Sequence, residues 1–176
     1  MPAVADASVL IWLAKTGRLN LLRDQYGTII IPTEVYSEVV EEGNREGYPD
    51  AYVVKEAVEK GWIIVEADET GEKKRIANDI HEIHRGEAAA LVIALRNNLP
   101  LLIDESSGRT VAEALGLNPK GTMYVVLNAL REGNLTRSEA RDTIASMVSS
   151  GFRIEPSLLE RLLREVALFN ERDNSG

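Results

Sequence analysis

Short apolar runs alternate with longer stretches that carry apolar residues at helical spacing. The apolar runs predict strands at residues 2–5, 28–31, 62–65 and 99–103. Strands that alternate with helices are typical of βαβ units and a parallel sheet. The pattern therefore predicts the α/β class, with a three-layer α/β/α fold around a central parallel sheet of four or five strands.

The last third of the chain is mostly helical in pattern. Thr136 and Glu139 have the spacing of a capping box and predict a helix start. A final amphipathic helix over 156–169 carries an apolar stripe, which either packs in the core or contacts a partner. We therefore predict an α/β domain over residues 1–135 and a helical extension over 136–176 that packs on the same domain.

The composition excludes several kinds of chemistry. The 176 residues include no Cys, so disulfides, thiolate metal sites and Cys nucleophiles are absent. No apolar run reaches the length of a membrane span and the N-terminus lacks a basic leader, so we expect a cytoplasmic protein. A net charge of −8 argues against broad, non-specific binding of nucleic acid, although an acidic pocket that binds divalent ions is compatible with it.

Two of the predicted strands end in an aspartate, namely Asp6 and Asp104. In open α/β sheets, ligands bind outside the carboxyl ends of the strands. Glu38 lies on the helix after the second strand, and Glu87 lies in the first turn of the helix before the fourth. Four carboxylates from separate segments could converge there, and sites made of oxygen ligands select Mg²⁺ or Mn²⁺.

Each acid also has a simpler interpretation. Asp6 and Asp104 could cap the helices that follow them. Glu87 could be placed by the preference of acids for a helix N-terminus. Glu38 could belong to a solvated helix face. The pattern of residues alone leaves the metal pocket and these interpretations open.

Other candidates carry weaker signals. His81 and His84 are three residues apart, whereas the zinc metalloprotease pattern has a spacing of four, so a solvated helix end is favoured. The basic run 73–75 is interpreted as a solvated loop with RNA contact as the alternative, and Lys15 is better placed near the acidic strand ends. Three aromatic residues are interpreted as core rather than as stacking platforms for bases: Trp12, Tyr36 and Trp62. Since no glycine-rich phosphate loop follows a strand, Rossmann and kinase folds have no motif support.

Four segments in order resemble the motifs of the PIN-domain family: 6–15, 30–39, 86–95 and 101–105. Gly121-Thr122 is similar to the VapC-like prokaryotic subgroup that has extra C-terminal helices. The resemblance implies a PIN-like nuclease domain and a metal-dependent endoribonuclease, with Mg²⁺ or Mn²⁺ as cofactor and RNA as substrate. It further implies the toxin of a toxin–antitoxin pair, with a cognate antitoxin as partner. We also expect a homodimer.

The resemblance also assigns roles by position. The catalytic and metal-binding quartet would be Asp6, Glu38, Glu87 and Asp104, with Glu105 as an auxiliary metal-binding acid. Ser8 would orient Asp6 or a metal-bound water, and Arg109 would support the site or contact the substrate.

The chain departs from the family pattern after the fourth motif. No basic residue stands between Glu105 and Arg109, which predicts a lower affinity for RNA or a lower activity. Two alternatives to a ribonuclease are a catalytically weak or inactive PIN-like module that binds RNA or a partner protein, and a Mg²⁺-dependent phosphohydrolase that acts on small phosphoesters.

Overall fold

The computed structural model describes residues 1–67 and 83–169. Within these ranges the sheet has four strands in the order β3-β2-β1-β4, and all neighbouring strands are parallel. The strands are β1 (Ala3–Ala5), β2 (Ile29–Pro32), β3 (Ile63–Glu66) and β4 (Leu101–Leu102). All four predicted strands are confirmed, and β3 extends one residue beyond its predicted end, to Glu66.

The helices follow the predicted order between these strands. The first unit of the fold contains α1 (Ala7–Lys15), α2 (Asn20–Tyr26), α3 (Thr33–Tyr36), η1 (Ser37–Glu42), α4 (Gly43–Glu46), α5 (Pro49–Glu59), α7 (Arg85–Asn97) and α8 (Ser106–Ala114). Residues 68–82, between β3 and α7, lie outside the described residues.

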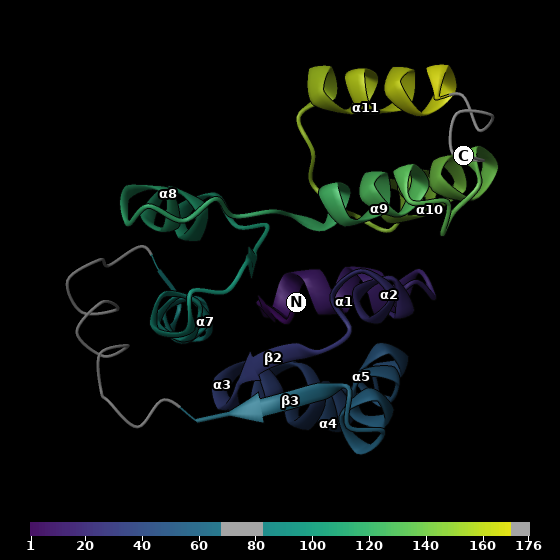
Figure 1. Ribbon diagram of the computed structural model, residues 1–176. Coiled ribbons are helices and arrows are strands. Elements are labelled where there is room, and N and C mark those ends of the chain that lie inside the picture. Colours follow the sequence, from purple (N-terminus) through teal and green to yellow (C-terminus); the bar gives the residue numbers. More distant parts are fainter. Residues whose placement is uncertain (68–82, 170–176) are drawn as a thin grey trace. The chain divides into compact units, whose positions relative to one another are not determined.

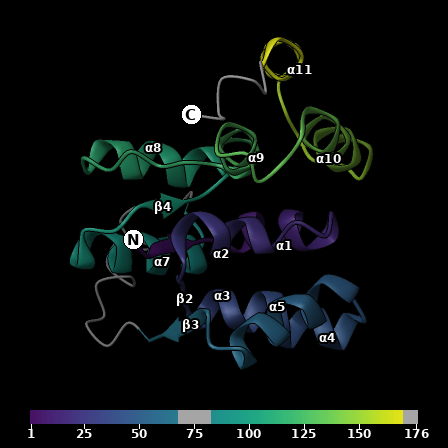
Figure 2. The ribbon, with the colours of Figure 1, turned by 45° about the vertical axis from the view of Figure 1, so that its right-hand side comes forward.

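Helices cover both faces of the sheet. Helix α7 packs against β1, β2 and β4, while α5 packs against β3 and α1. Figures 1 and 2 show α7 on one side of the strands and α1 and α5 on the other. The predicted three-layer α/β/α fold is confirmed, and its buried central strand β1 is apolar throughout because neither of its faces meets water.

Small residues let α7 approach the sheet closely. Its stretch from Ala88 to Ala94 is fully enclosed and forms a core cluster with Val4, Leu101 and Ile103. A similar approach occurs at Gly108 of α8, where a Cβ atom would lie only 2.4 Å from Ile103 Cδ1. This close packing fixes the starts of α7 and α8 beside the end of β4.

A short return segment extends the sheet beyond β4. The N–H of Ile103 donates to the carbonyl of Lys120 over 2.7 Å, and the N–H of Lys120 donates to the carbonyl of Leu101 over 2.9 Å. Leu102 and Lys120 form a parallel bridge. This pairing brings Gly121 and Thr122 next to the residues that follow β4.

The chain divides into two compact units, Met1–Thr122 and Met123–Gly176. The second contains nearly all of α9 (Thr122–Arg131), α10 (Arg137–Ser149) and α11 (Pro156–Leu168). The capping box at Thr136 is confirmed, since its hydroxyl accepts from the N–H of Glu139 and its own N–H donates to the Glu139 carboxylate. The predicted division at residues 135/136 stays a prediction. None of the helices in the described residues is long and apolar enough to cross a membrane.

Candidate active site

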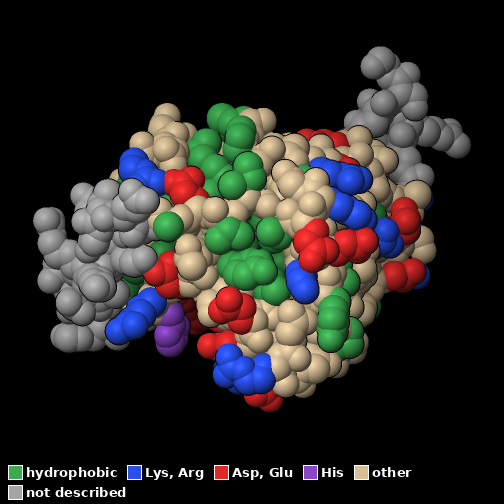
Figure 3. Space-filling view, turned by 90° about the horizontal axis from the view of Figure 1, so that it is seen from below, with side chains coloured by type: hydrophobic (Ala, Val, Ile, Leu, Met, Phe, Trp, Pro, Cys, Tyr) green, Lys and Arg blue, Asp and Glu red, His purple; other side chains and the backbone are tan. Residues whose placement is uncertain are grey.

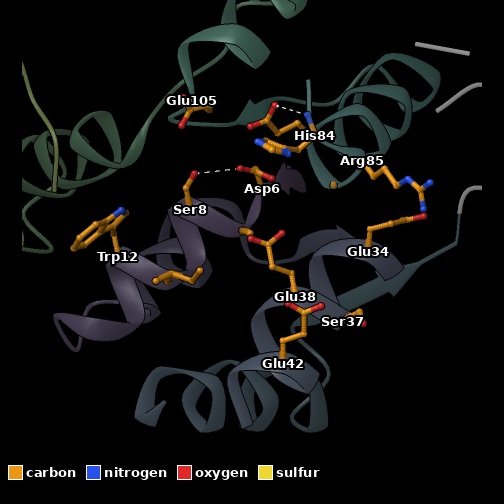
Figure 4. A pocket seen from close by; sticks show the side chains of 14 residues that line it. Asp6, Ser8, Trp12, Glu34, Ser37, Glu38, Glu42, His84, Arg85 and Glu105 are labelled. Atoms are coloured by element: carbon orange, nitrogen blue, oxygen red, sulfur yellow. Dashed lines mark hydrogen bonds between the residues drawn. The ribbon is translucent and has the colours of Figure 1, made fainter. Parts of the chain in front are cut away.

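A cavity of about 800 Å³ opens beside the carboxyl end of β1. Its lining is dominated by acidic side chains, which come from the segment after β1, from the helix after β2 and from the starts of α7 and α8. They are Asp6, Glu34, Glu38, Glu42, Glu87 and Glu105. Figure 4 shows them around one pocket, and Figure 3 shows acidic side chains gathered beside the purple histidine on one face.

Asp6 is one of the two buried acids of the pocket, with 5% of its surface exposed. It occupies the N-cap position of α1, but its side chain makes no capping hydrogen bond. Instead the Ser8 hydroxyl donates to Asp6 Oδ2 over 3.2 Å (Figure 4). Burial raises the pKa of Asp6 and nearby Asp104 adds to the rise, while the Ser8 hydroxyl and the neighbouring backbone N–H groups of Ala7 and Ser8 oppose it.

Glu38 reaches the pocket from a π-helical segment. Thr33–Glu46 is continuous helix, and its middle part, Ser37–Glu42, has π geometry. Glu38 is exposed, and in Figure 4 its carboxylate points toward Asp6. Partial desolvation raises the pKa of Glu38, and the charge of Asp6 adds to the rise. A π segment within an α-helix is frequent at functional sites, because it redirects the side chains it carries.

Glu87 enters the pocket from the first turn of α7, and 5% of its surface is exposed. Its Oε2 accepts from the backbone N–H of His84 over 3.2 Å, so it also caps the helix. Burial is the main cause that raises the pKa of Glu87 to about 7, and repulsion from Asp6 adds to it. Helix capping and a place in the pocket, which the sequence left as alternatives, therefore occur together.

Asp104 is turned away from the pocket lining. Its Oδ1 accepts from the N–H of Thr122 over 2.8 Å, and its Oδ2 accepts from the Thr122 hydroxyl over 2.6 Å. Gly121 makes room for this arrangement, since a Cβ there would lie 2.6 Å from Asp104 Oδ1. Burial raises the pKa of Asp104, whereas Thr122 and Arg109 lower it. The charge of Asp104 therefore raises the pKa of Asp6, although both Asp104 oxygens accept hydrogen bonds from Thr122.

Thr122 is a residue of the site to which the sequence interpretation gave no role. The signal was the Gly121-Thr122 pair, whose partner could not be read from the chain. Replacing Thr122 with Val is expected to lower the free energy of unfolding by about 1–2 kcal/mol, because the Asp104 carboxylate loses a buried donor. Chemical denaturation measures the effect. The same substitution at Thr110, whose hydroxyl donates to Ser106 on the exposed face of α8, is the control and should change stability by less than about 0.5 kcal/mol.

The two remaining predicted residues lie near β4. Glu105 is the exposed N-cap residue of α8 and lines the pocket. Arg109 donates from Nη1 to the carbonyl of Ile103 over 3.1 Å and lies beside Asp104. The structure therefore places Arg109 as a support for the segment after β4.

The oxygen atoms that line the pocket have the chemistry of ligands for a divalent cation. Carboxylate oxygens are the ligands that Mg²⁺ and Mn²⁺ prefer, and the mutual repulsion of Asp6, Glu38 and Glu87 is the kind that a bound cation relieves. Among the described residues, however, no three Asp, Glu or His side chains are gathered closely enough to ligate one ion as they stand. The chemistry of the pocket fits a hard cation, and its side chains would have to adjust to enclose one.

Two other sequence predictions concern residues at this pocket. Trp12 is not a core residue, because its half-buried indole lines the cavity. His84 is exposed, but it is the N-cap residue at the start of α7 and lines the cavity, so it is more than a solvated helix end. His81 and the basic run 73–75 lie outside the described residues.

Comparison with known proteins identifies the family of this chain. A model of the DUF3368 family, described as a PIN domain, matches residues 2–167. Among solved structures, the chain is similar to a PilT N-terminus domain protein from the hyperthermophilic archaeon Sulfolobus solfataricus, with 20% sequence identity and a TM-score of 0.51. The match covers 74% of this chain and 94% of that one, and it shows a shared fold. No curated protein matches the chain.

Proposed function

The chain belongs to the PIN-domain family, and from that premise we propose that it is an endoribonuclease dependent on Mg²⁺ or Mn²⁺. PIN domains are generally nucleases and typically use divalent metals. The observation that carries the proposal is that Asp6, Glu38 and Glu87, from three separate elements, line one cavity, where the charge of Asp6 raises the pKa of both glutamates. Carboxylates so placed favour binding of a cation.

The roles proposed for the residues follow from their contacts. Asp6, Glu38 and Glu87 would hold the metal, with Glu105 near the mouth. Ser8 orients Asp6 through its hydroxyl. A bound divalent cation would supply charge neutralisation for the phosphodiester and a more acidic water. Each oxygen of Asp104 accepts a hydrogen bond from Thr122 and the carboxylate does not line the pocket, so we propose that this acid joins the site only when its side chain turns.

The second candidate function is a weak or inactive PIN-like module that binds RNA or a partner protein. The engagement of Asp104 with Thr122 favours it, because one predicted metal ligand is already satisfied by the protein. In the described residues, no three acidic or histidine side chains already lie close enough together to bind one ion, which also favours this second candidate. The two candidates differ in one measurable property, namely cleavage that depends on metal.

Metal removal is expected to abolish cleavage. Purified protein should cut a mixed-sequence single-stranded RNA in Mg²⁺ or Mn²⁺, and excess EDTA should reduce the rate to background because the carboxylates alone offer no means to activate water. Product formation on denaturing gels measures the rate, and restoring Mn²⁺ should restore it. RNA binding without metal-dependent cleavage would instead establish the module, and hydrolysis of small phosphoesters but not of RNA would establish a different phosphohydrolase.

The finer biological role is proposed from the family resemblance. The chain would act in the cytoplasm as the toxin of a toxin–antitoxin pair, as a homodimer inhibited by a cognate antitoxin. Suppression of growth on expression, relieved by a co-expressed neighbouring reading frame, would support this role.

A further inference from the structure

One face of α1 continues from the acidic pocket to an aromatic ring and a cation. Ser8, Trp12 and Lys15 are spaced by four and three residues and therefore share a face of the helix. Trp12 is half-buried and Lys15 is exposed, whereas the residues at positions 9, 10, 13 and 14 are buried in the core. The Lys15 ammonium lies 5.2 Å from the centroid of the Trp12 ring.

Trp12 lies at the end of the pocket away from most of its carboxylates. Figure 4 shows the indole beyond Ser8 as seen from Asp6, with Glu34 and Glu42 toward the opposite end. The pocket residues nearest to Trp12 along α1 are Ser8 and Ile11, which carry no charge. A polyanion that enters this pocket therefore meets few carboxylates at the Trp12 end, where Lys15, next to the lining, supplies a positive charge, while Arg85 lies beside Glu34 at the opposite end.

Resting on the ribonuclease function proposed above, we propose that Trp12 and Lys15 form a subsite for an unpaired nucleotide next to the scissile phosphate. The base stacks on the Trp12 indole as the Lys15 ammonium, which lies over the ring in this structure, moves aside to contact the adjoining phosphate. The substrate is accordingly single-stranded nucleic acid, since a base held in a duplex does not offer its face to a protein side chain.

Stacking of a base on Trp12, rather than charge attraction, is the interaction expected to hold RNA at this subsite. The protein carries a net charge of −8 and six acidic side chains line the pocket, so charge attraction over a wide surface cannot hold RNA. Stacking of a base on an aromatic ring does not depend on charge and tolerates every base. Trp12 is also four residues from Ser8, about 6 Å along the helix, so a stacked base would lie roughly one nucleotide from a phosphate beside Asp6.

Binding is measured without metal, so that it does not depend on cleavage. A Trp62→Phe variant leaves Trp12 as the sole tryptophan, since the chain has two. In EDTA, titration with a short single-stranded RNA should quench its fluorescence, and a duplex of the same sequence should not. Trp62 precedes β3 and is absent from the pocket lining, so this background should bind RNA as the native protein does.

Two substitutions separate stacking from charge. Trp12→Leu should weaken binding of single strands by about 5- to 100-fold, while Trp12→Phe should restore most of it, because a phenyl ring still stacks. Lys15→Gln should reduce the slope of log Kd against log salt by about 0.7, the value for one phosphate contact on a single strand. Lys55→Gln, which removes a lysine paired with Glu59 on α5, is the control and should leave the slope unchanged.

The outcomes distinguish this subsite from the proposed enzyme. If wild type cleaves RNA but Trp12→Leu binds it as tightly as wild type, the subsite is wrong and the ribonuclease stands. If wild type never cleaves but Trp12 is quenched and required for binding, the subsite stands and the ribonuclease fails. Equal binding of duplex and single strand, or no binding in EDTA, overturns the subsite.

Discussion

Asp6→Asn is expected to reduce metal-dependent RNA cleavage by at least about 100-fold while the fold persists. Loss of residues that merely orient metal ligands already costs 10- to 100-fold, and Asp6 is the most central of the proposed ligands. Asparagine has the same shape and its oxygen can still accept from the Ser8 hydroxyl, so packing around α1 is preserved. Initial cleavage rates in Mg²⁺ and Mn²⁺ measure the effect.

A matched control is available in the same unit. Asp50 is also a buried aspartate, with 7% of its surface exposed, but it lies in the first turn of α5 and does not line the pocket. Asp50→Asn should therefore keep the wild-type rate. An Asp6→Asn protein that is folded by circular dichroism and as active as Asp50→Asn would show that Asp6 is not part of a catalytic site.

The positions of the site acids along the chain could be predicted, because sheet topology sets them. Asp6 follows an apolar strand, and the carboxyl ends of parallel strands meet at one edge. Glu87 was placed at a helix start by a local rule that also holds in the structure. These features depend on a few neighbouring residues and are visible in the sequence.

The direction of individual side chains could not be predicted in the same way. Asp104 turns to Thr122 because Lys120 pairs with β4 and because Gly121 leaves space, which are contacts across a distance of 18 residues. Trp12 fits the apolar pattern of α1, and only the surrounding elements decide that its ring borders a cavity. The π segment from Ser37 to Glu42 is equally hidden, because the apolar pattern predicts a helix without fixing its hydrogen-bond spacing.

Glu87→Gln is expected to stabilise the metal-free protein at pH 8 by up to about 3 kcal/mol. The pKa of Glu87 is about 7 in the folded chain against 4.5 for an unperturbed glutamate. Between these values the folded state binds more protons than the unfolded state, so the free energy of unfolding falls as pH rises through this window. Glutamine removes this penalty and keeps an oxygen that can accept from the N–H of His84.

Urea denaturation in EDTA at pH 5 and pH 8 tests this expectation. The two proteins should be nearly equally stable at pH 5, where folded Glu87 is protonated, and should diverge toward pH 8. Glu113→Gln on the exposed surface of α8 should show no such divergence. A Glu87→Gln protein that is less stable than wild type at both pH values would mean that the carboxylate stabilises the fold as a helix cap by more than its burial and repulsion destabilise it. The charge of Glu87 would then not destabilise the metal-free protein. The proposed metal site would lose one of the three repelling charges that a bound cation is expected to neutralise.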